Sequence, residues 1–227
     1  VDTGRILDRL EATLGGFGEV TPPFELPPRP HPMTERRDRT LTMKREQAHI
    51  VVGAPGVALD DPRRHALDIL ATALGGQSGR LFLELRDRRS LAYSVSAMHL
   101  DGFHPGAFAT YIATRPDRAE EAEVALRDEL SSAGERLSEE EVQRAKQYLV
   151  GSHEIGLQRA TARASAMALM EAYGRGYDEP FSYADRVEAV TVDEVRDIAR
   201  EFSDTSGWVT ARVLPESSRP GAKRSSG

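Results

Sequence analysis

Two residues with the chemistry to act on a polar substrate, Arg86 and Tyr93, stand seven positions apart in this 227-residue sequence. Arginine carries a permanent positive charge on a rigid fork of hydrogen-bond donors. Tyrosine offers one hydroxyl donor on an otherwise apolar ring. If the fold brings Arg86 and Tyr93 together, the two side chains offer a fixed positive charge and a hydroxyl donor in one place.

The segment that carries them changes character twice. A glycine-rich turn at 75–79 precedes a short amphipathic helix that contains Arg86. The pattern then changes to a strand with Leu91, Tyr93 and Val95 on one face. A helix that turns directly into a strand can point the arginine and the tyrosine into the same space above the junction.

A purely structural role for both residues stays open on this pattern alone. An arginine beside the apolar stripe of a helix is usually a solvated surface charge. A tyrosine on a strand is usually half-buried, with its hydroxyl at the rim.

The wider motif resembles a known family. Its parts are Gly-Gly-x-x-Gly-Arg-Leu-Phe at 75–82, Leu-Arg at 85–86 and Leu-Ala-Tyr-Ser-Val at 91–95. Together they are similar to the C-terminal half-domain of pitrilysin/insulinase-type zinc metallopeptidases, the superfamily of mitochondrial processing peptidase and of the core subunits of the cytochrome bc complex. The resemblance extends from residue 1 to Pro215.

The resemblance implies an α/β roll, and it makes Arg86 and Tyr93 the candidate catalytic and substrate-binding residues. In that family an arginine and a tyrosine with this spacing face the zinc site from the opposite half of the molecule. Tyr93 would then donate a hydrogen bond to the substrate carbonyl oxygen as that oxygen becomes negative, and Arg86 would supply positive charge and hold backbone carbonyls. The implied activity is zinc-dependent hydrolysis of peptide bonds.

The zinc motif of the family's hydrolytic half, His-x-x-Glu-His, is absent from this sequence. The histidines are His31, His49, His65, His99, His104 and His153. His153-Glu154 comes nearest to a zinc motif, but Leu157 stands where a His-Glu-x-x-His motif needs its second histidine. We therefore expect no metal or cofactor in this chain, zinc in a partner half, and no activity of this chain alone.

Proline content and the resemblance suggest four segments. Residues 1–20 are expected to be the last helix of a preceding half-domain, and residues 21–34, with their many prolines, an extended linker. Residues 35–215 are expected to form the C-terminal peptidase-like half-domain. Residues 216–227 are rich in serine, glycine and basic residues, which predicts a disordered tail.

Local signals within 35–215 predict strands and helices in an irregular order. They include a helix whose first residue is Pro62, an antiparallel hairpin over 92–113, capping boxes that open with Ser138 and Thr191, and a last strand over 208–214. The strands are not separated by regular crossovers, which disfavours a doubly wound parallel sheet. The expected fold class is α/β (α+β): a mostly antiparallel sheet with helices packed on one face.

Composition excludes several function classes. The sequence has no cysteine, which excludes disulfides, thiolate metal sites and a cysteine nucleophile. Its net charge of −6, without a basic stripe, disfavours nucleic-acid binding. No apolar run approaches the length of a membrane span, and no signal peptide is evident. Because the sequence starts with Val1 rather than methionine, we expect a piece of a longer protein.

The partners that we expect are a zinc-binding half-domain, in cis or in trans, and a peptide substrate; a dimer is possible. Two other functions stay open: a non-catalytic structural subunit of the same superfamily, or a stand-alone peptide-binding module that adds an extended chain to a strand edge. The compartment is left undetermined, since bacterial cytoplasm and periplasm both fit.

Overall fold

A single mixed sheet organises the larger part of the chain. The computed structural model describes residues 2–16, 28, 35–76, 78–204 and 208–216. Its five strands are β1 (Arg37–Met43), β2 (Ala48–Pro55), β3 (Ser94–Leu100), β4 (Ala107–Thr114) and β5 (Val209–Pro215). They lie in the order β1-β5-β2-β4-β3, and only β1 and β5 run parallel. The predicted, mostly antiparallel sheet and the predicted hairpin are confirmed.

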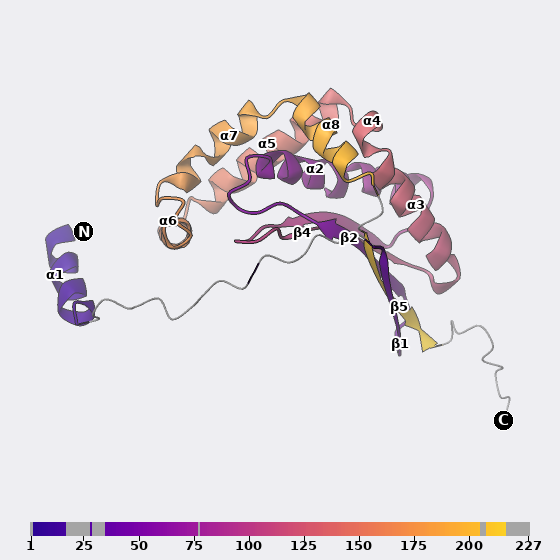
Figure 1. Ribbon diagram of the computed structural model, residues 1–227, viewed down its shortest axis with the longest axis horizontal. Helices are drawn as coiled ribbons and strands as arrows, with labels where there is room; N and C mark the ends of the chain where they lie inside the picture. The colour runs from indigo at the N-terminus through magenta and orange to yellow at the C-terminus, as the bar shows by residue number, and fades with distance from the viewer. Residues whose placement is uncertain (1, 17–27, 29–34, 77, 205–207, 217–227) are drawn as a thin grey trace. The chain divides into compact units, whose positions relative to one another are not determined.

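Within the described residues from 35 onward, the helices lie on one face of this sheet, and none of them covers the other face (Figure 1). They are α2 (Arg64–Gly75), η1 (Phe82–Arg88), η2 (Pro116–Arg118), α3 (Ala119–Ser131), α4 (Ala133–Arg136), α5 (Glu139–Gly156), α6 (Ala160–Ala172), η3 (Glu179–Ser182), α7 (Tyr183–Ala189) and α8 (Val192–Glu201). Strands β1 and β5 extend beyond the helical layer (Figure 1). The predicted arrangement, with helices on one face only, is also confirmed.

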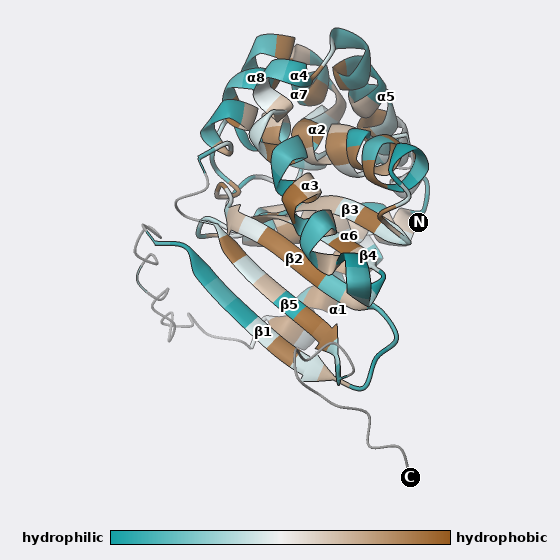
Figure 2. Ribbon diagram, turned by 90° about the vertical axis from the view of Figure 1, so that its right-hand side faces the viewer, coloured by the Kyte–Doolittle hydropathy of each residue, from teal (hydrophilic) through white to brown (hydrophobic). Residues whose placement is uncertain are grey.

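The alternation of side chains along the strands separates core from open face. In β2, Ile50 and Val52 are fully buried under the helices, whereas Val51 between them is exposed. Figure 2 shows the apolar residues of β2 and α2 and the largely polar upper part of β1. In β5, the side with Thr210 and Arg212 is more polar than the side with Val209, Ala211 and Val213. The Arg212 guanidinium donates to Glu123 of α3 at 2.6 Å.

The N-terminal segment is a separate unit, residues 1–31, described here by itself. Its helix α1 (Thr3–Leu14) forms where a helix was predicted, and the Asp2 side chain caps it by accepting a hydrogen bond from the Arg5 amide. The predicted linker lies outside the described residues except for Pro28, and the predicted tail lies outside them except for Glu216. The four proposed segments therefore stay predictions.

Capping residues fix the starts of the long helices. Both predicted capping boxes are present: the Ser138 amide donates to Glu141 at 2.8 Å, and the Thr191 amide donates to Glu194 at 2.7 Å. The start predicted for α2 is wrong by two residues. The Asp61 side chain accepts from the Arg63 amide at 2.8 Å and holds Pro62 in a turn, so the helix begins at Arg64.

The glycine turn lets α2 end directly against β3. A Cβ atom on Gly75 would lie 2.2 Å from the amide nitrogen of Ala97 and 2.8 Å from its carbonyl oxygen. A Cβ atom on Gly79 would lie 2.6 Å from the Leu74 carbonyl oxygen. Neither position has room for a side chain, so both positions require glycine for steric reasons.

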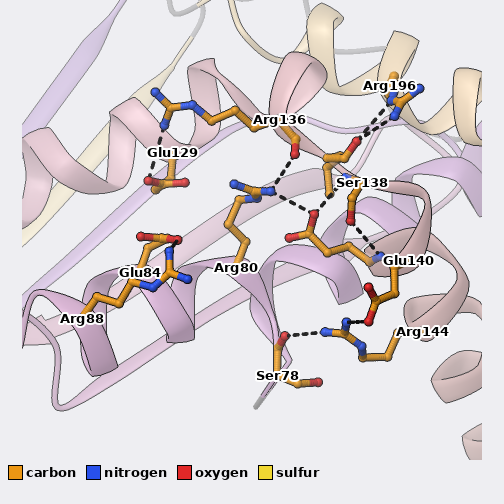
Figure 3. Close-up of polar contacts among 12 residues, drawn as sticks. Ser78, Arg80, Glu84, Arg88, Glu129, Arg136, Ser138, Glu140, Arg144 and Arg196 are labelled. Carbon is orange, nitrogen blue, oxygen red and sulfur yellow. Dashed lines mark hydrogen bonds and ion pairs between the residues drawn. The ribbon is translucent and has the colours of Figure 1, made fainter.

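The helix that follows, η1, is a π-helix of seven residues, a wider form than the α-helix and one often found at functional sites. Leu81 and Leu85 anchor it in the core and are fully buried. Just before it, the Arg80 guanidinium donates to the Arg136 carbonyl oxygen at 2.6 Å and to Glu141 at 2.9 Å (Figure 3). Arg80 thereby ties the start of η1 to α4 and to the capping box of α5.

A buried carboxylate lies beside this anchor. Glu129 of α3 is 5% exposed, and it forms an ion pair with Arg136 at 3.6 Å (Figure 3). Burial raises the pKa of the Glu129 carboxyl, and the negative charge of Glu84 raises it further, against the opposing effects of Arg80 and Arg136. The anchor of η1 therefore contains a group whose ionisation opposes folding.

Gly75→Ala should destabilise the fold by about 2 kcal/mol or more, because the new methyl group overlaps the backbone of Ala97. Gly151→Ala is the matched control: Gly151 lies inside α5 with nothing within 4 Å of an added Cβ. That change should stabilise the fold by about 0.5–1 kcal/mol. Urea unfolding of both variants measures the two effects, and equal effects would show that the close approach at Gly75 carries no constraint.

Glu129→Gln should stabilise the fold at pH 8 and have no effect below about pH 4. An unfolded glutamate has a pKa of about 4.3. Because the pKa of Glu129 is raised in the folded state, the folded form loses stability as the pH rises through that pKa. Urea unfolding at both pH values tests this, with exposed Glu135→Gln as the control. A gain of the same size at pH 4 and pH 8 would contradict it.

Candidate functional site

Arg86 lies on the outer side of η1 and is exposed. Its guanidinium carbon stands 4.7 Å from the centre of the Phe82 ring, a cation–π contact that orients the side chain without neutralising it. Among the described residues, none forms an ion pair with Arg86. The charge is therefore available to a ligand.

Tyr93 stands at a bend immediately before β3, and 54% of its surface is exposed. Its amide donates to the Ala113 carbonyl oxygen of β4 at 2.8 Å. The prediction of a strand with Leu91, Tyr93 and Val95 on one face is wrong in part: Leu91 and Val95 are buried, and Tyr93 is not. The strand begins only at Ser94, so Tyr93 is the residue immediately before it.

The loop between the two residues is closed by backbone bonds. The Leu91 amide donates to the Leu85 carbonyl oxygen at 2.7 Å, and Leu85 is the neighbour of Arg86. The Leu91 carbonyl oxygen accepts from the Thr114 hydroxyl at 2.5 Å. Arg86 and Tyr93 thus flank one short, tied loop. They form no hydrogen bond with each other, and both are open to solvent.

A second cation lies in the electrostatic range of the tyrosine. Arg115, directly after β4, forms a two-bond ion pair with Asp117, at 3.1 Å from Nε to Oδ1 and 2.6 Å from Nη2 to Oδ2. Hydrogen bonding to the Asp117 carboxylate raises the pKa of Arg115, and Tyr93 adds a smaller electrostatic contribution. Sequence reasoning missed Thr114 and Arg115, because only the pairing of β3 with β4 brings them to Tyr93.

Two of the histidines, His153 and His99, have structural partners. His153 Nε2 is 2.7 Å from the Pro180 carbonyl oxygen, and its ring stacks on Tyr183 with centres 4.3 Å apart. His99 Nδ1 is 2.8 Å from an oxygen of Asp68 in α2. Across the described ranges, no group of three or more histidine, aspartate or glutamate side chains could hold a metal ion. These residues therefore do not fit a zinc site of their own.

In the same part of the chain, no helix has both the length and the apolar character that crossing a bilayer requires.

Comparison with known proteins identifies the family. The family model of the peptidase M16 inactive domain matches residues 1–149. An uncharacterized zinc protease of Streptomyces coelicolor is 36% identical over 215 residues, which are 88% of this chain and 45% of that protein. An uncharacterized zinc protease of Mycobacterium tuberculosis is 37% identical over 161 residues, 69% of this chain and 36% of that protein. The chain thus spans less than half the length of these relatives.

Solved structures show the same fold. A protease from Helicobacter pylori superposes with a TM-score of 0.81 at 17% identity, over 95% of this chain and 53% of that one. The peptidase M16 inactive domain from Pseudomonas fluorescens superposes with a TM-score of 0.72 at 20% identity, over 80% and 44% of the two chains. The metallopeptidase resemblance of the glycine turn and the Leu-Ala-Tyr-Ser-Val segment is confirmed: the chain belongs to the peptidase M16 family and forms its inactive domain.

Proposed function

We propose that this domain is the half without zinc of a zinc-dependent metalloendopeptidase, and that Arg86 and Tyr93 bind the substrate and stabilise the transition state opposite the zinc site of a partner half-domain. The observation that carries the proposal is the tied loop between the two residues. Its backbone bond joins Leu85, next to Arg86, to Leu91, two residues before Tyr93. The Arg86 guanidinium has no ion-pair partner among the described residues, and the Tyr93 phenol is exposed.

Each residue has a separate task in the proposed reaction. When bound in the partner half, zinc would act as a Lewis acid and would activate the attacking water. The Tyr93 hydroxyl donates a hydrogen bond to the carbonyl oxygen of the scissile peptide, or of its neighbour, and this bond strengthens as the oxygen gains negative charge. Arg86 holds backbone carbonyl groups with its fork of donors and adds a positive field. This chain contributes hydrogen bonds and charge and transfers no proton.

The partner half-domain is proposed to be of similar size and to lie either on the same chain or on another. The lengths of the relatives support it: this chain spans 45% of the Streptomyces coelicolor zinc protease, which leaves room for a second half. The 53% coverage of the Helicobacter pylori protease is consistent with the same division.

A stand-alone peptide-binding module is the second candidate. Among the described strands, β1 lies at the edge of the sheet and pairs with β5 alone, and every one of its residues is exposed. Such an edge can accept an extended peptide as a further strand. Peptide affinity of this chain without zinc or a partner would favour this candidate.

Tyr93→Phe, made in the full-length protein or in this chain reconstituted with its zinc-binding half, should lower kcat by ~10²–10³, because one transition-state donor is lost. The measurement is zinc-dependent cleavage of a fluorescence-quenched peptide that the unsubstituted protein cleaves. Tyr177→Phe is the matched control, since Tyr177 is 59% exposed and lies outside the proposed site. Cleavage unchanged by Tyr93→Phe would falsify the role of Tyr93.

Arg86→Lys should also lower kcat/KM, by roughly 10-fold or more, although the charge is kept. Lysine is a point charge and cannot present the planar fork of donors. Steady-state kinetics on the same peptide measures the loss. Exposed Arg88→Lys on the same helix is the control and should behave like the unsubstituted protein. Full activity of Arg86→Lys would limit the residue to a general electrostatic contribution.

A further inference from the structure

A buried hydroxyl reaches out of the sheet to the loop that carries the proposed site. Thr114, the last residue of β4, is 1% exposed, and its hydroxyl donates to the Leu91 carbonyl oxygen at 2.5 Å. The pairing of β3 with β4 ends at Ser94 and Ala113. The Thr114 bond therefore lies beyond the last residue pair of the ladder and holds the approach to β3.

Both backbone polar groups of Leu91, in the segment that leads into β3, are hydrogen-bonded. Its amide donates to the Leu85 carbonyl oxygen, next to Arg86. Its carbonyl oxygen accepts a hydrogen bond from the Thr114 hydroxyl. Leu91 stands two residues before Tyr93. The preceding residue, Ser90, has φ of +49°, a conformation that costs free energy for any residue except glycine and persists only where neighbouring contacts hold it.

We propose that Thr114 is a positioning residue for peptide-bond hydrolysis, which fixes the placement of Tyr93 relative to Arg86 by holding the Leu91 carbonyl oxygen. The inference rests on the proposed function of Arg86 and Tyr93. Without the hydroxyl, the loop keeps its bond to η1 and the bond of the Tyr93 amide to Ala113, but it loses the second bond to β4, at Leu91. A single backbone bond then holds Tyr93 to β4, and its side chain is placed less precisely. Misplacement of a reacting group by about 1 Å can cost on the order of 10² in rate.

The same strand offers a matched control. Thr110 is also fully buried on the helix side of β4, and its hydroxyl donates to the Val52 carbonyl oxygen at 3.0 Å. Val52 and Thr110 are already paired in the ladder between β2 and β4. The Thr110 bond therefore joins two strands that the backbone holds together, whereas the Thr114 bond joins a strand to a loop.

The experiment compares Thr114→Val, Thr114→Ser and Thr110→Val in the full-length zinc-loaded protein, with a fluorescence-quenched peptide cleaved by the unsubstituted protein. Thr114→Val should lower kcat roughly 10-fold or more with little change in KM, because substrate binding survives and alignment does not. Thr114→Ser keeps the hydroxyl and should retain kcat. Thr110→Val should also retain kcat, while its loss in melting temperature matches that of Thr114→Val.

A second kinetic arm uses the Tyr93→Phe background. If Thr114 acts through Tyr93, adding Thr114→Val to Tyr93→Phe should change kcat by less than about 2-fold, because the group to be positioned is gone. An equal loss in both backgrounds overturns the proposal. If Tyr93→Phe alone is fully active, the proposed function fails first and the positioning role fails with it.

A readout without zinc or substrate completes the test. In this chain, amide hydrogen exchange of a peptide spanning 89–93 should become faster in Thr114→Val and stay unchanged in Thr110→Val. Thr114→Ala provides the same comparison should the valine variant not fold. Equal exchange in all variants, together with an intact effect of Tyr93→Phe on kcat, overturns the positioning role and leaves the proposed function standing.

Discussion

The approach of α2 to β3 is the constraint on which the candidate site depends. Gly75 ends the helix where any side chain would overlap the backbone of Ala97. Because the helix end and the strand are fixed against each other there, the segment between Gly75 and β3 must leave the sheet, form η1 and return within a short stretch of chain. The backbone bond between Leu85 and Leu91 closes that excursion. Arg86 directly follows Leu85, and Tyr93 stands two residues after Leu91, so the candidate residues adjoin the two ends of this bond.

The start of the same segment, just before η1, is held by the charged side chain of Arg80. Arg80 donates to the Arg136 carbonyl oxygen and to Glu141, and Glu141 also caps α5 (Figure 3). One guanidinium therefore links the start of η1 to the ends of two helices. Glu129 nearby has a raised pKa through burial, so this region combines a strong anchor with a group that resists ionisation. The site residues themselves lie away from that network and carry no competing ion pair among the described residues.

Much of the fold could be predicted from local patterns, and the partners of the site could not. The capping boxes at Ser138 and Thr191 and the hairpin are set by neighbours in sequence, and all are present. The bonds of Arg80 to Arg136 and of Thr114 to Leu91 join residues 56 and 23 positions apart. No local periodicity encodes them. The start of β3 at Ser94, rather than near Leu91, has the same origin. The Leu91 amide and carbonyl are hydrogen-bonded to Leu85 and Thr114 and are therefore not available for strand pairing.

The width of η1 gives this surface a means of adjustment. A π-helix differs from an α-helix by carrying an additional residue in its turn, so removing one residue restores the narrower helix. Each residue advances the side-chain direction by about 100° around an α-helix axis. Deletion of one residue between Leu81 and Arg86 would therefore rotate the guanidinium of Arg86 away from its present direction while the buried Leu81 stayed in place. Members of a lineage could thus redirect this cation through changes in length alone, without altering the sheet beneath it.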